Sequence, residues 1–210
     1  IDAGWLAMAA NRHCYNLDHF LADPAEVCRS FVSHADPSNV DLAVIEGNRG
    51  LFDGLDIEGT TSTASLAKLL SAPVILCLDC TKSTRTMAAV VLGCLHFDPS
   101  VNIQGVILNR VAGRRHEGIL RNSIEQHCGV NVIGAIPKLD QQDFPERHMG
   151  LIPTPEHVLV GHSIKIAAAN VSRHVDLDAV LQIAADSATL QITCPEKIES
   201  RSASIDTGQP

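Results

Sequence analysis

The sequence predicts an α/β fold built on a mostly parallel sheet with helices on both faces. Four short apolar runs have the length and composition of buried strands, namely Leu42–Ile45, Pro73–Leu78, Ile103–Leu108 and Val130–Ile136. They recur about every 30 residues, the length of a βαβ unit. Hydrophobic residues make up 45% of the chain and aromatic residues only 3%, so the core must be aliphatic, as in buried parallel sheets.

Helices are expected between and after these runs. Asp23 precedes Pro24 at the first helical position, and Glu26 follows at the third, which is the pattern of a helix start. Further helices are predicted over Ala64–Leu70, Met87–Phe97, Arg115–His127, Glu156–Ser172 and Asp176–Ala188. In the last of these, one buried stripe is expected from the spacing of Leu177, Val180, Leu181, Ala184, Ala185 and Ala188. We expect one domain over residues 1–188 and a linker or disordered tail over 189–210.

Composition restricts the class of partner and the compartment. The net charge of -8 argues against a general nucleic-acid binder. No signal peptide or membrane-length apolar run is visible, so we expect a cytoplasmic protein without a membrane partner. Seven scattered cysteines suit a reduced compartment. Cys77 and Cys80 have Cys-x-x-Cys spacing, but packing in an apolar strand explains them better than metal or redox use.

A glycine-rich segment after the first predicted strand is the first candidate site, because ligands of α/β sheets bind beyond the carboxyl ends of strands. Glu46 ends that strand, and Gly47, Gly50 and Gly54 follow. The connection to the next helix is roughly 16 residues, longer than the usual 2–6 or so. A carboxylate at a strand tip suits Mg²⁺ beside nucleotide phosphates. An ordinary glycine-rich turn with a solvated acid explains the pattern equally well.

Two later strand ends are also candidates. Asn109 follows the third predicted strand and offers a donor and an acceptor that match an adenine edge, although a turn-forming asparagine is the simpler interpretation. Pro137 ends the last strand. Beyond it, Arg147 and His148 form a mixed-charge cluster that fits an anionic substrate or, equally, surface pairing with nearby acids.

These segments, taken in order, resemble the amidoligase domain of the cobyrinic acid a,c-diamide synthases over residues 1 to about 185. The matching pieces are Asp2, residues 15–18, Glu46-Gly-x-x-Gly-Leu-Phe-Asp-Gly54, residues 64–74, His96-Phe-Asp-Pro99, Gly105-Val-Ile-Leu-Asn-Arg110 and Glu146-Arg-His-x-Gly-Leu151. The resemblance implies a P-loop NTPase-like fold of the dethiobiotin-synthetase type. It also implies ATP-dependent amidation of the a and c acetate side chains of a corrin through an acyl phosphate. The ammonia would come from glutamine, hydrolysed in a separate C-terminal glutaminase domain.

The resemblance also implies roles for individual residues. Glu46 would hold Mg²⁺, and Glu46, Asp53 and Asp2 would form the catalytic group. Asn109 would read adenine beside Pro137, with Gly47 and Gly50 also near the nucleotide. Asp2, Leu51, Asp53, Arg147 and His148 would face the tetrapyrrole and the acyl phosphate. Lys82 and Arg85 are further candidates for phosphate or substrate carboxylates.

The sequence departs from this family at the phosphate loop. It contains no G-x-x-x-x-G-K-[ST] pattern, although the family begins with a strand and such a loop. We therefore expect a piece of a longer enzyme that lacks the first strand and is inactive alone. Two alternatives stay open, namely amidation of another tetrapyrrole of the sirohydrochlorin or sirohaem type, and a non-catalytic interaction domain. A MinD-type ATPase is disfavoured because no membrane-binding C-terminal helix is visible. A homodimer is possible.

Overall fold

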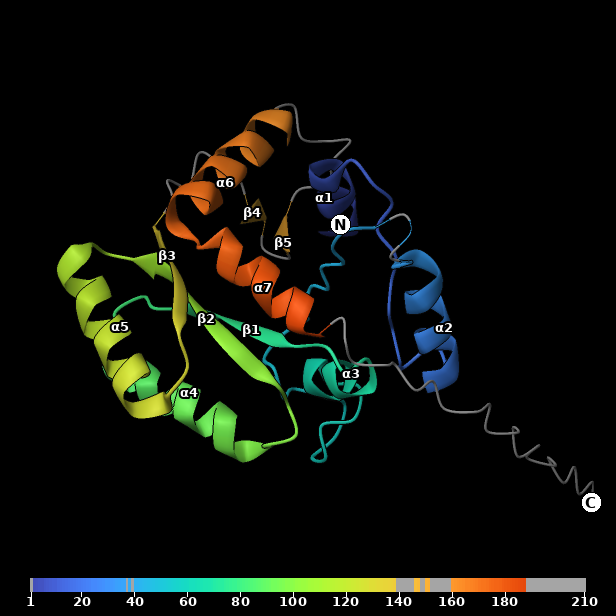
Figure 1. Cartoon of the computed structure of the whole chain (residues 1–210), viewed down its shortest axis with the longest axis horizontal. Coiled ribbons are helices and arrows are strands. Elements are labelled where there is room, and N and C mark those ends of the chain that lie inside the picture. The colour runs from blue at the N-terminus through green and yellow to red at the C-terminus, as the bar shows by residue number, and fades with distance from the viewer. Residues whose placement is uncertain are drawn as a thin grey trace, which may run out of the picture.

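A three-stranded parallel sheet forms the centre of the molecule (Figure 1). The computed structural model describes residues 2–36, 38, 40–138, 146–147, 150–151 and 160–187. The strands β1 (Val74–Asp79), β2 (Ile103–Val111) and β3 (Val132–Pro137) lie in the order β1-β2-β3. They confirm three of the four predicted strands, because each is an aliphatic run buried within the sheet.

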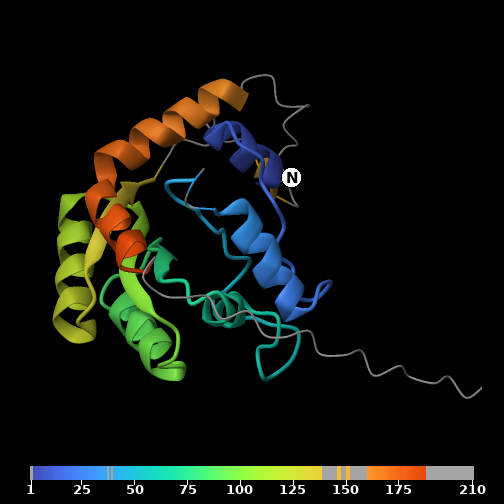
Figure 2. The same ribbon diagram turned by 45° about the vertical axis from the view of Figure 1, so that its right-hand side comes forward.

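Helices cover both faces of this sheet, which confirms the predicted fold class. On one face, α4 (Thr86–Phe97) connects β1 to β2 and α5 (Arg114–Cys128) connects β2 to β3, and the two helices pack side by side. The opposite face carries α6 (Val160–His174) and α7 (Leu177–Ser187), as the turned view in Figure 2 shows. The side chain of Ile183 in α7 lies over Gly105 of β2. A Cβ atom added to Gly105 would lie 3.4 Å from the Cδ1 atom of Ile183.

The core lies between the sheet and its helices and is aliphatic, as predicted. Its largest fully buried side chains come from α4, α5 and the central strand β2, and include Val91, Val106, Leu108, Leu120 and Ile124. Burial of each such side chain contributes about 1.5–3 kcal/mol. Val175, between α6 and α7, forms an antiparallel bridge to Gly134 and so covers the outer edge of β3.

The N-terminal part adds three helices and a smaller core. These are α1 (Asp2–Ala10), α2 (Pro24–His34) and α3 (Thr63–Leu69), and the smaller core joins α2 to α3 through Val27, Cys28, Leu66 and Leu70. The predicted start of α2 is confirmed, because the Asp23 carboxylate accepts a hydrogen bond of 2.7 Å from the Glu26 N–H. α1 lay outside the predicted elements, since its residues are apolar on every side and leave no stripe to detect.

The predicted strand Leu42–Ile45 is wrong. Residues 40–48 carry no strand or ladder hydrogen bonds, and the Val44 side chain is 81% exposed. A strand exists only when a neighbour completes its ladder. Within the described part of the chain nothing pairs with this segment, and the outer side of β1 is likewise unpaired.

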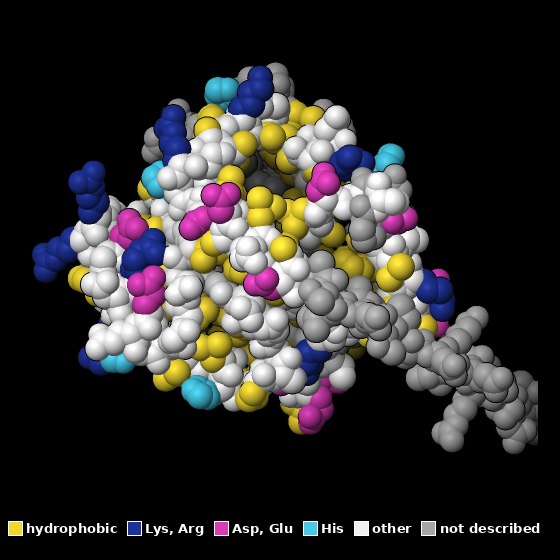
Figure 3. All heavy atoms as spheres, viewed as in Figure 1, with side chains coloured by type: hydrophobic (Ala, Val, Ile, Leu, Met, Phe, Trp, Pro, Cys, Tyr) yellow, Lys and Arg dark blue, Asp and Glu magenta, His cyan; other side chains and the backbone are white. Residues whose placement is uncertain are grey.

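The predicted face of α7 is also wrong in part. Leu177 and Leu181 are 44% and 52% exposed, and Ala185 is exposed too. The half-buried side of the helix carries Ala179, Val180, Ile183 and Ala184 instead, because Ile183 is the side chain that descends onto β2. Apolar side chains are accordingly visible around α7 and beside a hollow between α6 and α1 (Figure 3).

Two further elements complete the described chain. The short strands β4 (Glu146–Arg147) and β5 (Gly150–Leu151) form an antiparallel pair. Residues 156–159 of the predicted helix Glu156–Ser172 and the predicted tail over 189–210 lie outside the described residues. In the part that the structure describes, no helix combines the length and the apolar character needed to span a bilayer.

The Asp23 cap provides a test of the N-terminal part. We expect Asp23→Ala to lower the free energy of unfolding by about 1 kcal/mol, because the Glu26 N–H loses its acceptor. Urea denaturation followed by circular dichroism measures this loss. Asp23→Asn keeps a capping oxygen and serves as the control. An equal loss in both variants would show that the charge, and not the cap, is what α2 needs.

Candidate functional site

The carboxyl edge of the sheet gathers the loops that follow the three strands. We use this name for the ends of the strands at Asp79, Val111 and Pro137 together with the residues that follow them. The Cys80 N–H donates to the Asn109 carbonyl at 3.0 Å, and the Lys138 N–H donates to the Val111 carbonyl at 3.4 Å. Ligands of α/β sheets bind at this edge. Asn109 is exposed here and Pro137 is half-buried.

An ion pair connects the ends of β1 and β2. Arg110 Nη1 lies 3.2 Å from Asp79 Oδ2, and the Thr81 N–H donates to Asp79 Oδ1 at 2.8 Å. Hydrogen bonds from Thr81, and then the Arg110 guanidinium, hold the pKa of Asp79 below its usual value. The carboxylate therefore stays ionised. Lys82 and Arg85 follow in the same loop and are both exposed.

His116 fastens the start of α5 to the loop after β1. Its Nδ1 accepts from the Ala112 N–H at 3.0 Å, so the ring proton sits on Nε2 and is donated to the Ser83 carbonyl at 2.5 Å. Beside it lies an open depression of about 460 Å³ lined in part by Arg114 and Arg115. The carboxyl edge is therefore both polar and locally basic, which suits an anionic ligand.

The glycine-rich loop between Glu46 and Ser62 folds back on itself. The Gly50 N–H donates to Asp53 Oδ2 at 3.1 Å, and an added Cβ at Gly47 would lie 2.6 Å from Thr63 Cγ2. At Gly54 an added Cβ would meet the backbone of Gly59 and Thr60 closer than real contacts allow. Gly54 is thus required for close backbone approach within the loop, whereas Gly47 and Gly50 lie against the side chains of Thr63 and Asp53. Glu46 and Asp53 are exposed, and Leu51 is half-buried.

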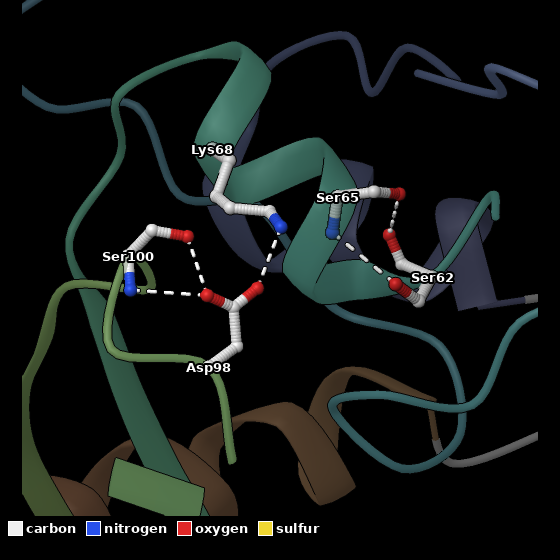
Figure 4. Close-up of polar contacts among 5 residues, drawn as sticks. All are labelled: Ser62, Ser65, Lys68, Asp98 and Ser100. Atoms are coloured by element: carbon white, nitrogen blue, oxygen red, sulfur yellow. Dashed lines mark hydrogen bonds and ion pairs between the residues drawn. The ribbon is translucent and has the colours of Figure 1, made fainter. Parts of the chain in front are cut away.

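A second depression, of about 210 Å³, lies where this loop meets α3 and the end of α4. Lys68 Nζ is 2.6 Å from Asp98 Oδ2, and Ser100 donates to the other carboxylate oxygen (Figure 4). Lys68, followed by Ser100, lowers the pKa of Asp98 to about 2. The Phe52 and Phe97 rings pack beside it with centroids 4.8 Å apart.

The structure places the predicted site residues in two regions. Phe52 of the glycine-rich loop packs on Phe97, just before β2 begins, whereas Asn109 lies near the other end of β2. At about 3.3 Å per residue, Asn109 is about 20 Å from the first residue of this strand. Asp2 begins α1 and Arg147 lies in β4, while His148 is outside the described residues. The roles assigned to all these residues remain predictions.

The side chains present restrict metal and thiol chemistry in the described part of the chain. Among the described residues no three or more His, Cys, Asp or Glu side chains converge as a metal-binding group. Mg²⁺ needs only one or two carboxylates when water and phosphate supply the rest, so Glu46 alone still fits it. Cys80 is fully buried, and this burial raises the pKa of its thiol, which makes it an inert packing residue.

Sequence reasoning missed Asp79 and His116, and it included Arg110 in a matching piece without assigning it a role. Asp79 and Arg110 stood at predicted strand ends, so the signal was available in their positions. Their pairing depends on the register that sets Asp79 opposite Asn109, and the sequence alone does not supply this register. The contacts of His116 depend in the same way on how α5 meets the loop after β1.

A parallel sheet between two helical layers, with polar side chains at its carboxyl edge, defines a layered α/β domain of the kind that binds ligands beyond its strand ends. Residues 8–146 match the family described as AAA domain, and the chain belongs to this family. The match confirms the P-loop-like fold class. No solved structure matches the chain.

The names of individual relatives are more specific than this family description. The chain is 41% identical over 210 residues to the cobyrinate a,c-diamide synthase of Magnetococcus marinus, which covers 100% of this chain and 44% of that protein. It is 38% identical over 198 residues to the enzyme of the same name from Salmonella typhimurium, covering 94% and 43%. It is 39% identical over 183 residues to the hydrogenobyrinate a,c-diamide synthase of Brucella ovis, covering 87% and 41%. The chain spans less than half the length of these relatives.

The close approach at Gly54 gives a test of the glycine-rich loop. We expect Gly54→Ala to lower the free energy of unfolding by about 1–3 kcal/mol, because the new methyl group displaces backbone of the same loop. Gly118→Ala is the matched control, since Gly118 lies within α5 with nothing within 4 Å of an added Cβ. It should stabilise the protein by about 0.5–1 kcal/mol. Urea denaturation of both variants measures these changes. Equal changes in the free energy of unfolding would contradict the close backbone contact at Gly54.

The Lys68–Asp98 pair predicts a pH effect. The pKa of Asp98 is lowered from 3.8 to about 2, so its contribution to stability is fully present above pH 3.8 and is lost as pH falls toward 2. We expect Lys68→Met to raise the pKa of Asp98 toward 3.8 and so to reduce the stability that is lost between pH 3.8 and pH 2. Carboxyl-carbon NMR titration of both proteins measures the change. A pKa near 3.8 for Asp98 in the wild-type protein would contradict a stabilising ion pair with Lys68.

Proposed function

We propose that the chain is the nucleotide-binding part of an ATP-dependent amidoligase that amidates the a and c acetate side chains of cobyrinic acid in cobalamin biosynthesis. The observation that carries this proposal is the 41% identity over all 210 residues to a cobyrinate a,c-diamide synthase. The described cysteines are free thiols, which suits a cytoplasmic enzyme.

Individual residues of the chain suit this chemistry. ATP supplies the phosphoryl group that turns a substrate carboxylate into an acyl phosphate, which ammonia then attacks. Asn109 presents its amide at the carboxyl edge, where it fits an adenine edge next to Pro137. Lys82 and Arg85 supply positive charge in the neighbouring loop. Glu46 offers hard carboxylate oxygens for Mg²⁺, and Gly47 and Gly50 keep side chains away from the backbone beside it.

The substrate side of the site rests on the glycine-rich loop. We assign Leu51 and Asp53, with Asp2, Arg147 and His148, to the tetrapyrrole and its carboxylates. The Gly50 N–H donates to Asp53 Oδ2 and so orients this exposed carboxylate, whose further lone pairs would meet a substrate. The ammonia would come from glutamine through a glutaminase domain in the remainder of a longer enzyme, since the relatives are more than twice as long as the chain.

A second corrin is a candidate substrate. The Brucella relative is named for hydrogenobyrinate and is nearly as similar, at 39% identity. Hydrogenobyrinate as the substrate is therefore the alternative that a specific observation favours. Amidation of a sirohydrochlorin-type tetrapyrrole would be a further outcome of the same experiment.

A chimera tests the proposal. The chain replaces its matching segment in the Salmonella typhimurium enzyme, and amide formation is followed by mass spectrometry with ATP, Mg²⁺, glutamine and each tetrapyrrole in turn. We expect diamide from cobyrinate, and no product from the 210-residue chain alone. Glu46→Gln should lower the rate by about a hundredfold or more, because a metal site contributes several kcal/mol.

Glu58→Gln is the matched control, since Glu58 is an exposed acid of the same loop without an assigned role. It should leave the rate unchanged. A folded chimera that binds ATP and amidates none of the tetrapyrroles would overturn the proposal. Equal rates for Glu46→Gln and Glu58→Gln would remove the metal role from Glu46.

A further inference from the structure

β2 contains a bulge at Asn109 and Arg110. Leu108 pairs with Ala135 and Val111 pairs with Pro137, so two residues of β2 lie opposite the single residue Ile136 of β3. Side chains of a regular strand alternate between its faces. Here Leu108 and Val111 are both buried, whereas Asn109 and Arg110 are both exposed. The bulge therefore presents two consecutive polar residues at the carboxyl edge while Val111 stays in the core.

Arg110 takes the backbone conformation that makes the bulge. Its φ is 58°, in the left-handed region that residues other than glycine, asparagine and aspartate seldom adopt. Such a conformation persists where its surroundings hold it in place. The ion pair with Asp79 is such a constraint, because Asp79 lies opposite Asn109 in the register of β1 and β2. The Thr81 N–H fixes the Asp79 carboxylate in turn.

The bulge also orients the Asn109 carboxamide. Its Oδ1 accepts from the Arg110 N–H at 2.9 Å. This bond identifies which end of the amide is the oxygen and leaves both Nδ2 protons and a second Oδ1 lone pair for a ligand. An adenine edge presents an amino donor beside a ring acceptor, whereas a 6-oxo purine presents two acceptors. An amide held in one orientation therefore accepts adenine and disfavours a 6-oxo purine.

We propose that Arg110 is a positioning residue for base selection, because its left-handed backbone and its ion pair with Asp79 hold the bulge that orients Asn109 toward adenine. The inference rests on the proposed function in one respect, namely that Asn109 meets the base of the nucleotide. It goes beyond that function by assigning Asp79 and Arg110 a role that neither the resemblance nor the comparisons give them.

The experiment compares adenosine with inosine, which differ in the group at purine position 6. The isotope-labelled chain is titrated with each nucleoside, and the Asn109 side-chain amide signal is followed by NMR. We expect adenosine to bind more tightly than inosine. Asp79→Asn and Arg110→Gly should each lower this preference by about threefold to fivefold, the most that an exposed ion pair contributes. Arg110→Gly keeps the left-handed backbone accessible and so isolates the loss of the pair.

The double variant should lose no more than either single variant, because both remove the same interaction. Asp56→Asn is the matched control. Asp56 is an exposed acid whose pKa is lowered by hydrogen bonds from Thr60, and it lies in the glycine-rich loop. It should leave the preference for adenosine unchanged. A preference that survives in Asp79→Asn and Arg110→Gly would overturn the proposal.

A second measurement needs no ligand. The order parameter of the Asn109 side-chain amide should be high in the wild-type chain and should fall in Asp79→Asn and Arg110→Gly but not in Asp56→Asn. Unchanged order in all three variants would overturn the positioning role even where adenosine binds. A fall in order without any adenosine signal in the wild type would instead refute Asn109 as the base contact. That outcome ends the base-selecting role and the nucleotide site of the proposed function together.

Discussion

The central strand β2 is the constraint on which the other features depend. It is paired with a strand on each side, and its buried residues, such as Val106 and Leu108, leave no room for larger side chains. Its hydrogen bonds fix where β1 and β3 end, and these ends define the carboxyl edge. The crossovers through α4 and α5 then bring the loops after all three strands to that edge. A change inside β2 would therefore displace the candidate site as well as the core.

The parts of the fold that the sequence predicted are those whose signal is local or fully buried. β1, β2 and β3 are continuous apolar runs because both of their faces are covered, and α2 begins with a cap that can be read from four residues. The failures have the opposite character. Among the described residues Leu42–Ile45 has the composition of a strand but finds no partner strand, and the half-buried side of α7 is set by tertiary packing such as that of Ile183 over Gly105.

The residues of the candidate site also differ in whether the sequence alone could select them. The rule that ligands bind at strand ends was enough to select Asn109 and Pro137, which the structure places at the carboxyl edge. The Asp79–Arg110 pair and the contacts of His116 needed the register and the helix positions, so no pattern in the sequence revealed them. Glu46 and its glycines were selected by motif, and the loop geometry explains Gly54 through its close contact with the backbone of Gly59 and Thr60.

The main sheet and its two crossover helices come from one continuous stretch of chain, from Val74 to Pro137. α2 packs on Leu66 and Leu70 in a second apolar cluster, whereas Ala64 of α3 belongs to the core of the sheet. Such an arrangement divides a protein into cooperative units that open with different free energies, so amide protons in β2 should exchange on the timescale of global unfolding while those of α2 exchange earlier. Substitutions that loosen α2 therefore act on a local equilibrium and leave the sheet intact, which allows α2 more variation in sequence.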